Sequence, residues 1–560
     1  MRLSIILLWF TAQLAIAIPP FKPSTAAGIG ISAQLTLLLN EKRYLEFEQS
    51  LKEAHDLAAP DRNFFFGVLA NLKNQTTESL RLLEPLLLQP QSALLTAAQS
   101  KLGWLALADD YTKSFEYGKA ADASARVLQQ YASLLGEQEK KAIDSDRQSD
   151  ELMRDYPARA VKVGRPFTLQ TKRDALGLIE GPVEVGGKTV SALFDTGADG
   201  SVLTMTLARQ LGLKISEATA TAGGAAGGVI QAHVALIPRL QIGDAEIRNI
   251  GAGIFEDKVL YIAPAHMQLD MIIGWPEIAA LGWVTFYADG RIGVSTSPNN
   301  QGAEMFLEGN KPLIAAKTGK GLRLFNLDTG APGTLLFDPY WNENKDAFAG
   351  VNPSPYQVLG VGGSHEVPAF NGVDVPLAFG TASVVLHNIS VLTKPHNTDP
   401  KEFFYGNLGQ DLLRPLRSWS LDFRSMRFEI DTGVSNRYVM GCRVDADEVV
   451  FVFEPSAYCV QIGADAQVHV AGDFNQWLGA SEGRINNPVP AWEMQRVAGD
   501  RYELHKKPSD FQQQPQWEFK FVVNLSQWID VPSAASNQTT SGGHMNFTLT
   551  MPGNPSKSVH

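Results

Sequence analysis

Two copies of the triplet Asp-Thr-Gly lie in the middle of the chain and define two matching halves. The first copy is Asp195–Gly197 and the second is Asp328–Gly330, and each directly follows an apolar run. A further apolar run ends at Gly274 in the first half and at Gly409 in the second. The offset between the halves is 328 − 195 = 133 at the triplets and 409 − 274 = 135 at the glycines. Such close agreement indicates an internal duplication, so we expect two similar lobes in one chain.

Between the triplet and the downstream glycine, each half also contains a glycine-rich stretch. Glycines at the tip of a β-hairpin allow it to bend and allow its backbone to approach a bound chain closely. A plain solvent-exposed loop is the alternative interpretation. The glycines concerned are Gly223, Gly224, Gly227 and Gly228 in the first half, and Gly360, Gly362 and Gly363 in the second.

The order of these motifs over residues 174–433 resembles that of retropepsin-like aspartic peptidases, with both halves of the enzyme in one chain. The resemblance implies an all-β, bilobal peptidase with a first lobe at 174–300 and a second lobe at 301–435. It also implies that Asp195 and Asp328 form the catalytic pair and that the glycine-rich hairpins are its flaps.

The same resemblance implies supporting roles for the other residues of the triplets. Thr196 and Thr329 should brace the two loops against each other through hydrogen bonds. Gly197 and Gly330 should keep the backbone clear of the water that the carboxylates share. No metal and no cofactor is implied, and the chain holds no His-Glu-x-x-His motif.

A pair of neighbouring carboxylates has a defined chemistry. Two carboxylates held together cannot both ionise, so the pair shares a proton. One can accept a proton from water while the other donates a proton to the carbonyl oxygen of a peptide bond. We therefore predict an aspartic endopeptidase that acts on peptide or protein substrates. Because one chain supplies both lobes, a monomer should be active.

Two other functions are compatible with the same residues. The first alternative is a catalytically silent envelope protein that binds glycans or protein partners. The second is a glycosidase that uses the same carboxylate pair. The net charge of −11 and the pI near 5.5 argue against nucleic acid or an anionic membrane as a partner.

The N-terminus carries a targeting signal. A basic start, an apolar run over Ile5–Ile16 and the small-x-small pattern Ala15–Ala17 indicate a secretory signal peptide at 1–17. We expect the protein to be secreted or periplasmic. A retained membrane anchor is the weaker alternative, because the apolar run is shorter than the ~20 residues that a span needs.

Residues 28–150 show leucine and alanine at helical spacing. Gly67 and Gly103 lie 103 − 67 = 36 residues apart, close to the period of tetratricopeptide repeats. The interpretation is a tetratricopeptide-like α-solenoid whose surface binds a protein partner. The alternative is a plain helical bundle without a partner.

Residues 441–560 contain strand-like runs that predict a β-sandwich. The order of motifs resembles the glycogen-binding module of AMP-activated kinase β subunits, which implies an α-glucan ligand on aromatic faces. The matching residues are Trp477, Lys520, Trp528 and Asn546. A sandwich with only a packing role is the alternative.

The chain has two cysteines, and both lie in this C-terminal domain. In an exported protein, Cys442 and Cys459 are expected to form a disulfide. Two buried thiols on neighbouring strands are the alternative.

Overall fold

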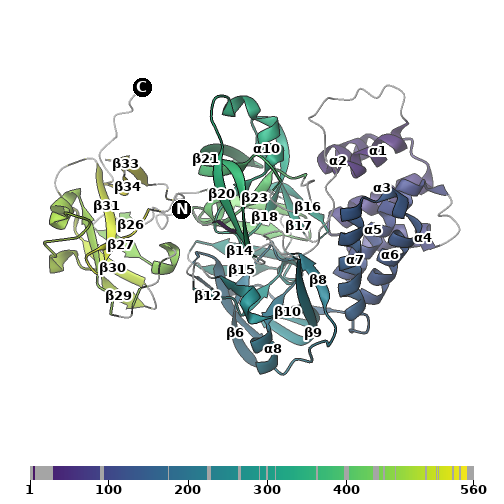
Figure 1. The fold of residues 1–560 in the computed structure, drawn as a ribbon, viewed down its shortest axis with the longest axis horizontal. Helices are drawn as coiled ribbons and strands as arrows, with labels where there is room; N and C mark the ends of the chain where they lie inside the picture. The colour runs from purple at the N-terminus through teal and green to yellow at the C-terminus, as the bar shows by residue number, and fades with distance from the viewer. Residues whose placement is uncertain are drawn as a thin grey trace.

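The structure is a computed structural model with an N-terminal helical region, a large β-rich middle part and a C-terminal β-domain (Figure 1). It describes residues 4–6 and 30–551, except 89–93, 175, 224–228, 263–265, 289, 298–300, 310, 361–362, 396–402, 433–440, 445–447, 459, 461, 464, 499–500, 512–513, 515, 532–534, 536 and 542–543. The predicted signal peptide at 1–17 lies outside the described residues apart from Ser4–Ile6. These three residues form strand β1, which pairs in parallel with Val358–Gly360.

The helical region consists of antiparallel neighbours that pack in sequence order. Its helices are α1 Ile31–Asn40, α2 Tyr44–Glu53, α3 Ala59–Leu72, α4 Thr76–Leu88, α5 Ala97–Lys113, α6 Tyr117–Gln130 and α7 Glu137–Leu152. A capping box between Thr96 and Gln99 fixes the start of α5.

Both predicted helix-borne glycines lie where helices approach closely. A Cβ atom on Gly67 would lie 2.6 Å from the side chain of Leu83, and one on Gly103 would lie 2.8 Å from the side chain of Leu87. Glycine therefore allows α3 and α5 to pack against α4. The helical character of this region is as predicted, whereas its assignment to a repeat solenoid stays a prediction.

The first lobe is built on a nine-stranded sheet in the order β2-β10-β7-β13-β6-β5-β9-β8, with β4 on β5. The strands are β2 Ala160–Val163, β4 Lys172–Arg173, β5 Ile179–Val185, β6 Lys188–Phe194, β7 Val202–Thr204, β8 Ala220–Gly223, β9 Val229–Ile242, β10 Ala245–Phe255 and β13 Met271–Ile273. A separate small pair is formed by β11 Tyr261–Ile262 and β12 Met267–Gln268, and two short helices are α8 Met205–Gln210 and α9 Trp275–Ala280.

The second lobe belongs to a fourteen-stranded sheet in the order β1-β20-β21-β22-β19-β23-β18-β17-β16-β25-β24-β14-β15-β3. Its strands, after β1, are β3 Phe167–Gln170, β14 Trp283–Tyr287, β15 Arg291–Ser295, β16 Ala303–Glu308, β17 Lys311–Thr318, β18 Gly321–Leu327, β19 Leu335–Leu336, β20 Ser354–Gly360, β21 Gly363–Phe379, β22 Ala382–Leu392, β23 Gly406–Leu408, β24 Ser418–Asp422 and β25 Arg427–Asp431. The short helices are α10 Asp338–Glu343 and α11 Gln410–Leu413.

The two lobes share one internal topology, as the duplicated motifs predict. In the first lobe β13 runs parallel to β6 and antiparallel to β7. In the second lobe β23 runs parallel to β18 and antiparallel to β19. The strand that ends in the downstream glycine therefore lies beside the strand that leads into the triplet, in both halves.

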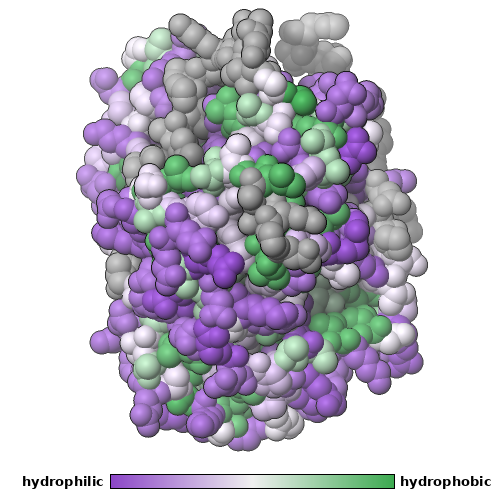
Figure 2. Space-filling model, turned by 90° about the vertical axis from the view of Figure 1, so that its right-hand side faces the viewer, coloured by the Kyte–Doolittle hydropathy of each residue, from purple (hydrophilic) through white to green (hydrophobic). Residues whose placement is uncertain are grey.

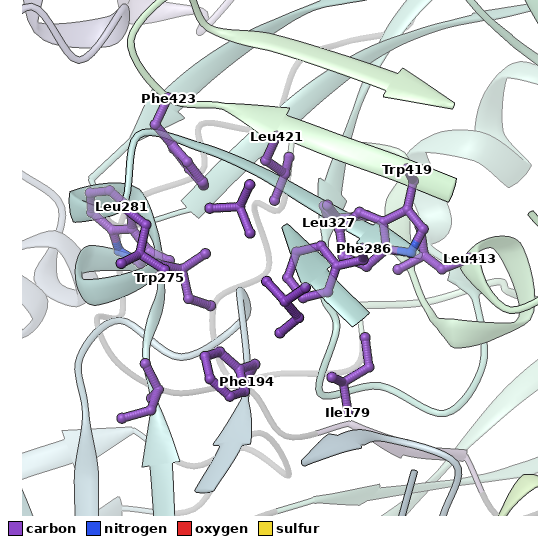
Figure 3. Packing of buried hydrophobic residues seen from close by; sticks show 14 of the residues in the cluster. Ile179, Phe194, Trp275, Leu281, Phe286, Leu327, Leu413, Trp419, Leu421 and Phe423 are labelled. Atoms are coloured by element: carbon purple, nitrogen blue, oxygen red, sulfur yellow. The ribbon is translucent and has the colours of Figure 1, made fainter. Parts of the chain in front are cut away.

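A strand of the first half pairs with a strand of the second half within one sheet. Strand β14 of the first half pairs with β24 of the second half over Trp283–Tyr287. Here Phe286 stacks on Trp419 with ring centroids 4.0 Å apart. Figure 3 shows this shared core, where Phe194 and Leu327, the residues just before the two aspartates, point into one apolar cluster. A common core under both triplets limits how far the lobes can move apart.

The helical region packs along one flank of both lobes and has no separate core (Figure 1). Against the second lobe, Lys42 pairs with Glu308 at 2.6 Å and Lys73 lies over the ring of Phe306 at 3.6 Å. Against the first lobe, the hydroxyl of Ser145 on α7 donates to the carbonyl of Thr221 on β8 at 2.6 Å.

The outer face of the helical region is mostly hydrophilic, with separate apolar groups (Figure 2). The exposed large apolar side chains of the helical region as a whole are Leu37, Phe66, Leu88, Leu94 and Leu134. A protein partner on this surface stays a prediction. Within the described part of the chain, no helix is long and apolar enough to cross a membrane.

The C-terminal domain has two sheets around one aromatic core. One sheet has the order β26-β27-β30-β29, formed by Cys442–Val444, Val449–Phe453, Arg501–Lys506 and Gln495–Ala498. The other has the order β28-β31-β34-β33 with β32 on β31, formed by Val468–Gly472, Gln516–Val523, His544–Thr550, Gln538–Ser541 and Gln527–Trp528.

The predicted disulfide of this domain is not formed in the structure. Cys442 is buried and carries a free thiol, whose pKa burial raises to about 12. The alternative of buried thiols thus describes Cys442, while Cys459 lies outside the described residues.

Candidate active site

The two triplets meet because each follows a strand that enters the interface between the lobes. Asp195 follows β6 and its backbone N–H donates to the carbonyl of Ile273 at 3.0 Å. Asp328 follows β18 and its backbone N–H donates to the carbonyl of Leu408 at 3.0 Å. Each triplet is therefore held by the apolar strand that ends in the downstream glycine of its own lobe.

The two threonines lock the loops together by reciprocal hydrogen bonds. The backbone N–H of Thr196 donates to the hydroxyl of Thr329 at 2.9 Å, and that of Thr329 donates to the hydroxyl of Thr196 at 3.1 Å. Each hydroxyl in turn donates across the lobe interface, to the carbonyls of Leu327 and Phe194. The bracing expected of these threonines is present, and both side chains are buried.

Asp195 and Asp328 lie face to face and are both completely buried. Oδ1 of Asp195 accepts the backbone N–H of Gly197 at 2.8 Å and that of Gly330 at 3.1 Å. The N–H of Gly330 also donates to Oδ1 of Asp328 at 3.1 Å. The outer Oδ2 atoms of both carboxylates accept no hydrogen bond from the described residues. The outer oxygens are thus the pair that can act on a bound molecule.

Burial raises the pKa of both carboxyl groups above the ordinary aspartate range. The charge of Asp195 raises the pKa of Asp328 further, whereas the backbone donors Gly197 and Gly330 favour the ionised form of Asp195. The two carboxyl groups therefore titrate as a coupled pair that shares a proton.

Gly197 and Gly330 are required by the close approach of the two loops. A Cβ atom on Gly197 would lie 2.5 Å from Oδ1 of Asp328, and one on Gly330 would overlap the carboxylate of Asp195 in the same way. Each glycine thus makes room for the carboxylate of the opposite lobe.

One segment of the chain matches a known protein family. Residues 181–276 match the family model of aspartyl protease. This segment spans the first lobe from β5 to the start of α9 and includes Asp195. The match supports an aspartic protease domain in this part of the chain.

Solved structures give a weaker comparison. A retropepsin-like aspartic protease from Rickettsia conorii has 16% identity and a TM-score of 0.16, with 24% of this chain and 91% of that chain covered. An aspartic proteinase from Irpex lacteus has 11% identity and a TM-score of 0.29, with 48% of this chain and 99% of that chain covered. None of the curated proteins compared with the chain is significantly similar to it.

The strands on either side of each glycine-rich stretch pair as a hairpin. In the first lobe β8 pairs with β9 up to Gly223, and Gly224, Gly227 and Gly228 lie outside the described residues. In the second lobe β20 pairs with β21 up to Gly360 opposite Gly363, and Gly362 lies outside the described residues. The hairpins are as expected, and their role as flaps stays a prediction.

Sequence reasoning missed a second brace on each loop. The hydroxyl of Ser201, six residues after Asp195, donates to the carboxyl of Glu277 at 2.5 Å and accepts the N–H of Gly274 at 3.2 Å. The hydroxyl of Thr334, six residues after Asp328, contacts Asp411 at 2.6 Å and accepts the N–H of Gly409 at 3.1 Å. Alignment of the two halves would have revealed this matched hydroxyl.

Glu277 is buried and Asp411 is half-buried, and both act within the scaffold. Burial raises the pKa of Glu277 and of Asp411. Glu277 ties α9 to the loop that carries Asp195, and Asp411 ties α11 to the loop that carries Asp328. Among the residues that the structure describes, no group of three or more His, Cys, Asp or Glu side chains could hold a metal ion.

The four predicted glycan residues lie on one face of the five-stranded sheet of the C-terminal domain. Lys520 on β31 lies on the same face as Val522, which is opposite Trp528. On β34, Thr548 is opposite Glu518, which lies two residues before Lys520 and on the same face. Asn546 lies two residues before Thr548 and therefore on this face too. Trp477 packs beside Trp528, with ring centroids 6.2 Å apart.

A hydrogen bond donated by the ring nitrogen orients each of the two indoles. Nε1 of Trp477 donates to Asp473 at 2.9 Å, and Nε1 of Trp528 donates to the carbonyl of Gly483 at 2.7 Å. Both tryptophans are half-buried, whereas Lys520 and Asn546 are mostly buried. Asn546 donates to Glu518 at 2.7 Å, so its amide is already engaged.

The raised pKa values of the dyad predict a shifted pH profile. Acid–base catalysis by this pair needs one proton on it, so activity should fail at low pH when the ionised member, Asp195, becomes protonated as well. Because burial raises that pKa, we expect the acid limb of kcat/KM above ~4, the value of an ordinary aspartate. An acid limb at the ordinary value would contradict the buried, proton-sharing pair.

The same shift predicts how stability depends on pH. A carboxyl whose pKa is raised by folding stabilises the native state below the unfolded pKa, and this contribution is lost as pH rises through the folded pKa. Asp328→Asn should therefore lose less stability with rising pH than the wild type. Thermal unfolding midpoints of both proteins, followed as the pH rises from ~4, the pKa of an ordinary aspartate, provide the measurement.

Proposed function

We propose that the protein is an exported aspartic endopeptidase that hydrolyses peptide bonds with a water activated by Asp195 and Asp328. The observation that carries this proposal is the buried pair of carboxylates, one from each lobe, whose outer oxygens accept no hydrogen bond from the described residues. The match of residues 181–276 to aspartyl protease supports it. Export rests on the signal-peptide pattern alone.

The chain's own groups account for each proton transfer. The ionised carboxylate of Asp195 accepts a proton from the attacking water, and the protonated carboxyl of Asp328 donates its proton to the carbonyl oxygen. The tetrahedral intermediate then breaks its C–N bond as the proton on Asp195 passes to the leaving amine. Asp328 recovers its proton from the diol, so the pair ends with one proton again.

The threonine and glycine contacts keep the two carboxylates in register for these steps. Reciprocal Thr196–Thr329 bonds hold the loops across the lobe interface, and a displacement of about 1 Å in such a site can cost a factor of ~10² in rate. The flap hairpins are proposed to cover the bound peptide from the opposite side.

A peptide library tests the proposed function directly. Purified protein is incubated with diverse peptides, and cleavage is followed by mass spectrometry. We expect internal cleavage that a statine-type peptide blocks, because its hydroxyl mimics the tetrahedral intermediate. Cleavage that resists this inhibitor, or no cleavage of any peptide, would favour the catalytically silent alternative.

A second function, α-glucan binding by the C-terminal domain, is favoured by the common face of Trp477, Trp528, Lys520 and Asn546. Indole faces can stack on the apolar faces of sugar rings. The tilt of 41° between the two indoles suits a curved chain better than a flat one. The platform is held by its own hydrogen bonds, so little ordering is needed on binding.

The glucan proposal predicts a selective loss on removal of one indole. Trp528→Ala in the full chain should weaken retardation of the protein in glycogen-containing native gels by roughly fivefold or more. Trp283, which lies in a lobe and not in this domain, provides the matched control as Trp283→Phe. Equal mobility of the wild type with and without glycogen would leave the domain with a packing role.

A further inference from the structure

A cavity of about 290 Å³ separates the helical region from the first lobe. Helices α5 and α7 form one wall. The opposite wall contains Asp199 and Gly200, which follow the catalytic triplet, and Ala220 and Ala232 at the base of the β8–β9 hairpin. The cavity wall thus includes residues that directly follow the Asp195 triplet and residues at the base of the first-lobe hairpin. We call this space the acid cavity.

The acid cavity has more carboxylates than cations. Each lysine that lines it already has an acidic partner. The pairs are Lys42 with Glu308 at 2.6 Å, Lys101 with Glu139 at 3.7 Å, and Lys113 with Asp109. Asp146 and Asp150, one turn apart on α7, also line the cavity, and neither has an ion pair among the described residues.

Asp150 is the decisive residue. It is only 4% exposed, and its nearest donor is the hydroxyl of Thr112, at 3.3 and 3.4 Å from the two carboxylate oxygens. That hydroxyl has one hydrogen and a closer acceptor, the carbonyl of Ala108 at 3.1 Å. Asp150 is thus a buried carboxylate without a dedicated donor. Burial raises its pKa well above the ordinary range.

The ionised form of such a buried carboxyl group is costly unless a cation or donor reaches it. The rest of the wall suits the stem of a long basic side chain, because it includes Leu105, Ile143 and Val234. A side chain with an apolar stem and a cationic head would cover these groups and pair with the two aspartates.

We propose that the acid cavity binds the side chain of a lysine or arginine of the peptide substrate, at a position several residues from the scissile bond. The proposal rests on the proposed peptidase function. It makes the helical region part of the substrate-binding site, since Asp146 and Asp150 come from α7 and Asp199 from the catalytic loop. Substrate selection would thus depend on both parts of the chain.

Matched peptides test this proposal. Peptides with one cleavable core, acetylated and amidated to remove terminal charges, carry arginine or its neutral near-isostere citrulline at each outer position in turn. We expect kcat/KM to be at least roughly tenfold higher for arginine at one position, mainly through KM. Lysine at that position should give a preference of the same sign. Equal rates for arginine and citrulline at every position would overturn the proposal.

Variants on α7 locate the effect. Asp150→Asn and Asp146→Asn should each reduce the ratio of arginine to citrulline rates toward one. The ratio is taken within each variant, so a general change in activity cancels. Asp144→Asn is the control, because Asp144 lies on the same helix but pairs with Arg147 and does not line the cavity. A full preference in both Asp146→Asn and Asp150→Asn would contradict the assignment.

Binding separates this proposal from the proposed function. Asp195→Asn protein is titrated with the fluorescent arginine and citrulline peptides, and anisotropy reports affinity without cleavage. Preferential binding of arginine together with no cleavage by the wild type would refute the peptidase and keep the cation site. Cleavage without any preference in rate or binding would refute the cation site and keep the peptidase.

Discussion

Replacement of either Asp195 or Asp328 by asparagine is expected to lower kcat/KM for peptide hydrolysis by a factor on the order of 10³ or more. An amide in place of the Asp195 carboxylate could not accept a proton from water, and an amide in place of the Asp328 carboxyl could not supply the proton that the carbonyl oxygen needs. Both side chains are fully buried and the amide has the size of a protonated carboxyl group, so the fold should persist. Either substitution alone should suffice, because the pair acts as a unit.

Initial rates on one cleavable peptide measure this effect, with circular dichroism and thermal unfolding as checks on the fold. Asp244→Asn is the matched control, since Asp244 is an exposed aspartate of the first lobe that pairs with Arg165. Substantial activity in either dyad variant would show that the two lobes do not form one site.

Gly197→Ala is expected to lower kcat/KM by a factor of ~10² or more, although it adds only one methyl group. The new Cβ atom would lie 2.5 Å from Oδ1 of Asp328, so the carboxylate of the opposite lobe must move. That movement would break the shared geometry of the two carboxylates and the N–H bond from Gly197 to Asp195.

Gly319→Ala, on the turn between β17 and β18, is the control because nothing lies within 4 Å of a Cβ atom at this position. Its activity should stay close to that of the wild type. If Gly197→Ala and Gly319→Ala had equal rates, the close approach of the two loops would not exist in solution.

Much of the site could be predicted from local sequence. The equal offsets of the triplets and of Gly274 and Gly409 predict the repeated topology, since each motif uses the same strand pairing in its own lobe. The hairpins at Gly223 and Gly360 follow from glycine-rich stretches between apolar strands.

Other features could not be predicted in this way. The pairing of Ser201 with Glu277 joins residues 76 apart, and that of Thr334 with Asp411 joins residues 77 apart. Neither spacing follows a helical or strand period, so only the packed lobes bring the partners together. The expected export of the protein predicts a disulfide between Cys442 and Cys459, whereas Cys442 carries a free thiol in the structure.

Local pattern and the repeat within one chain were sufficient to establish the two half-sites, the helical character of the N-terminal region and the β-character of the rest. Long-range packing, in contrast, places the helical region in a core shared with both lobes and encloses the acid cavity. The shared core and the cavity could not be predicted from local sequence pattern, because both depend on which residues the packed chain buries. Whether Asp150 is solvated or enclosed depends on contacts such as that of Ser145 with Thr221, between segments that the sequence pattern does not connect.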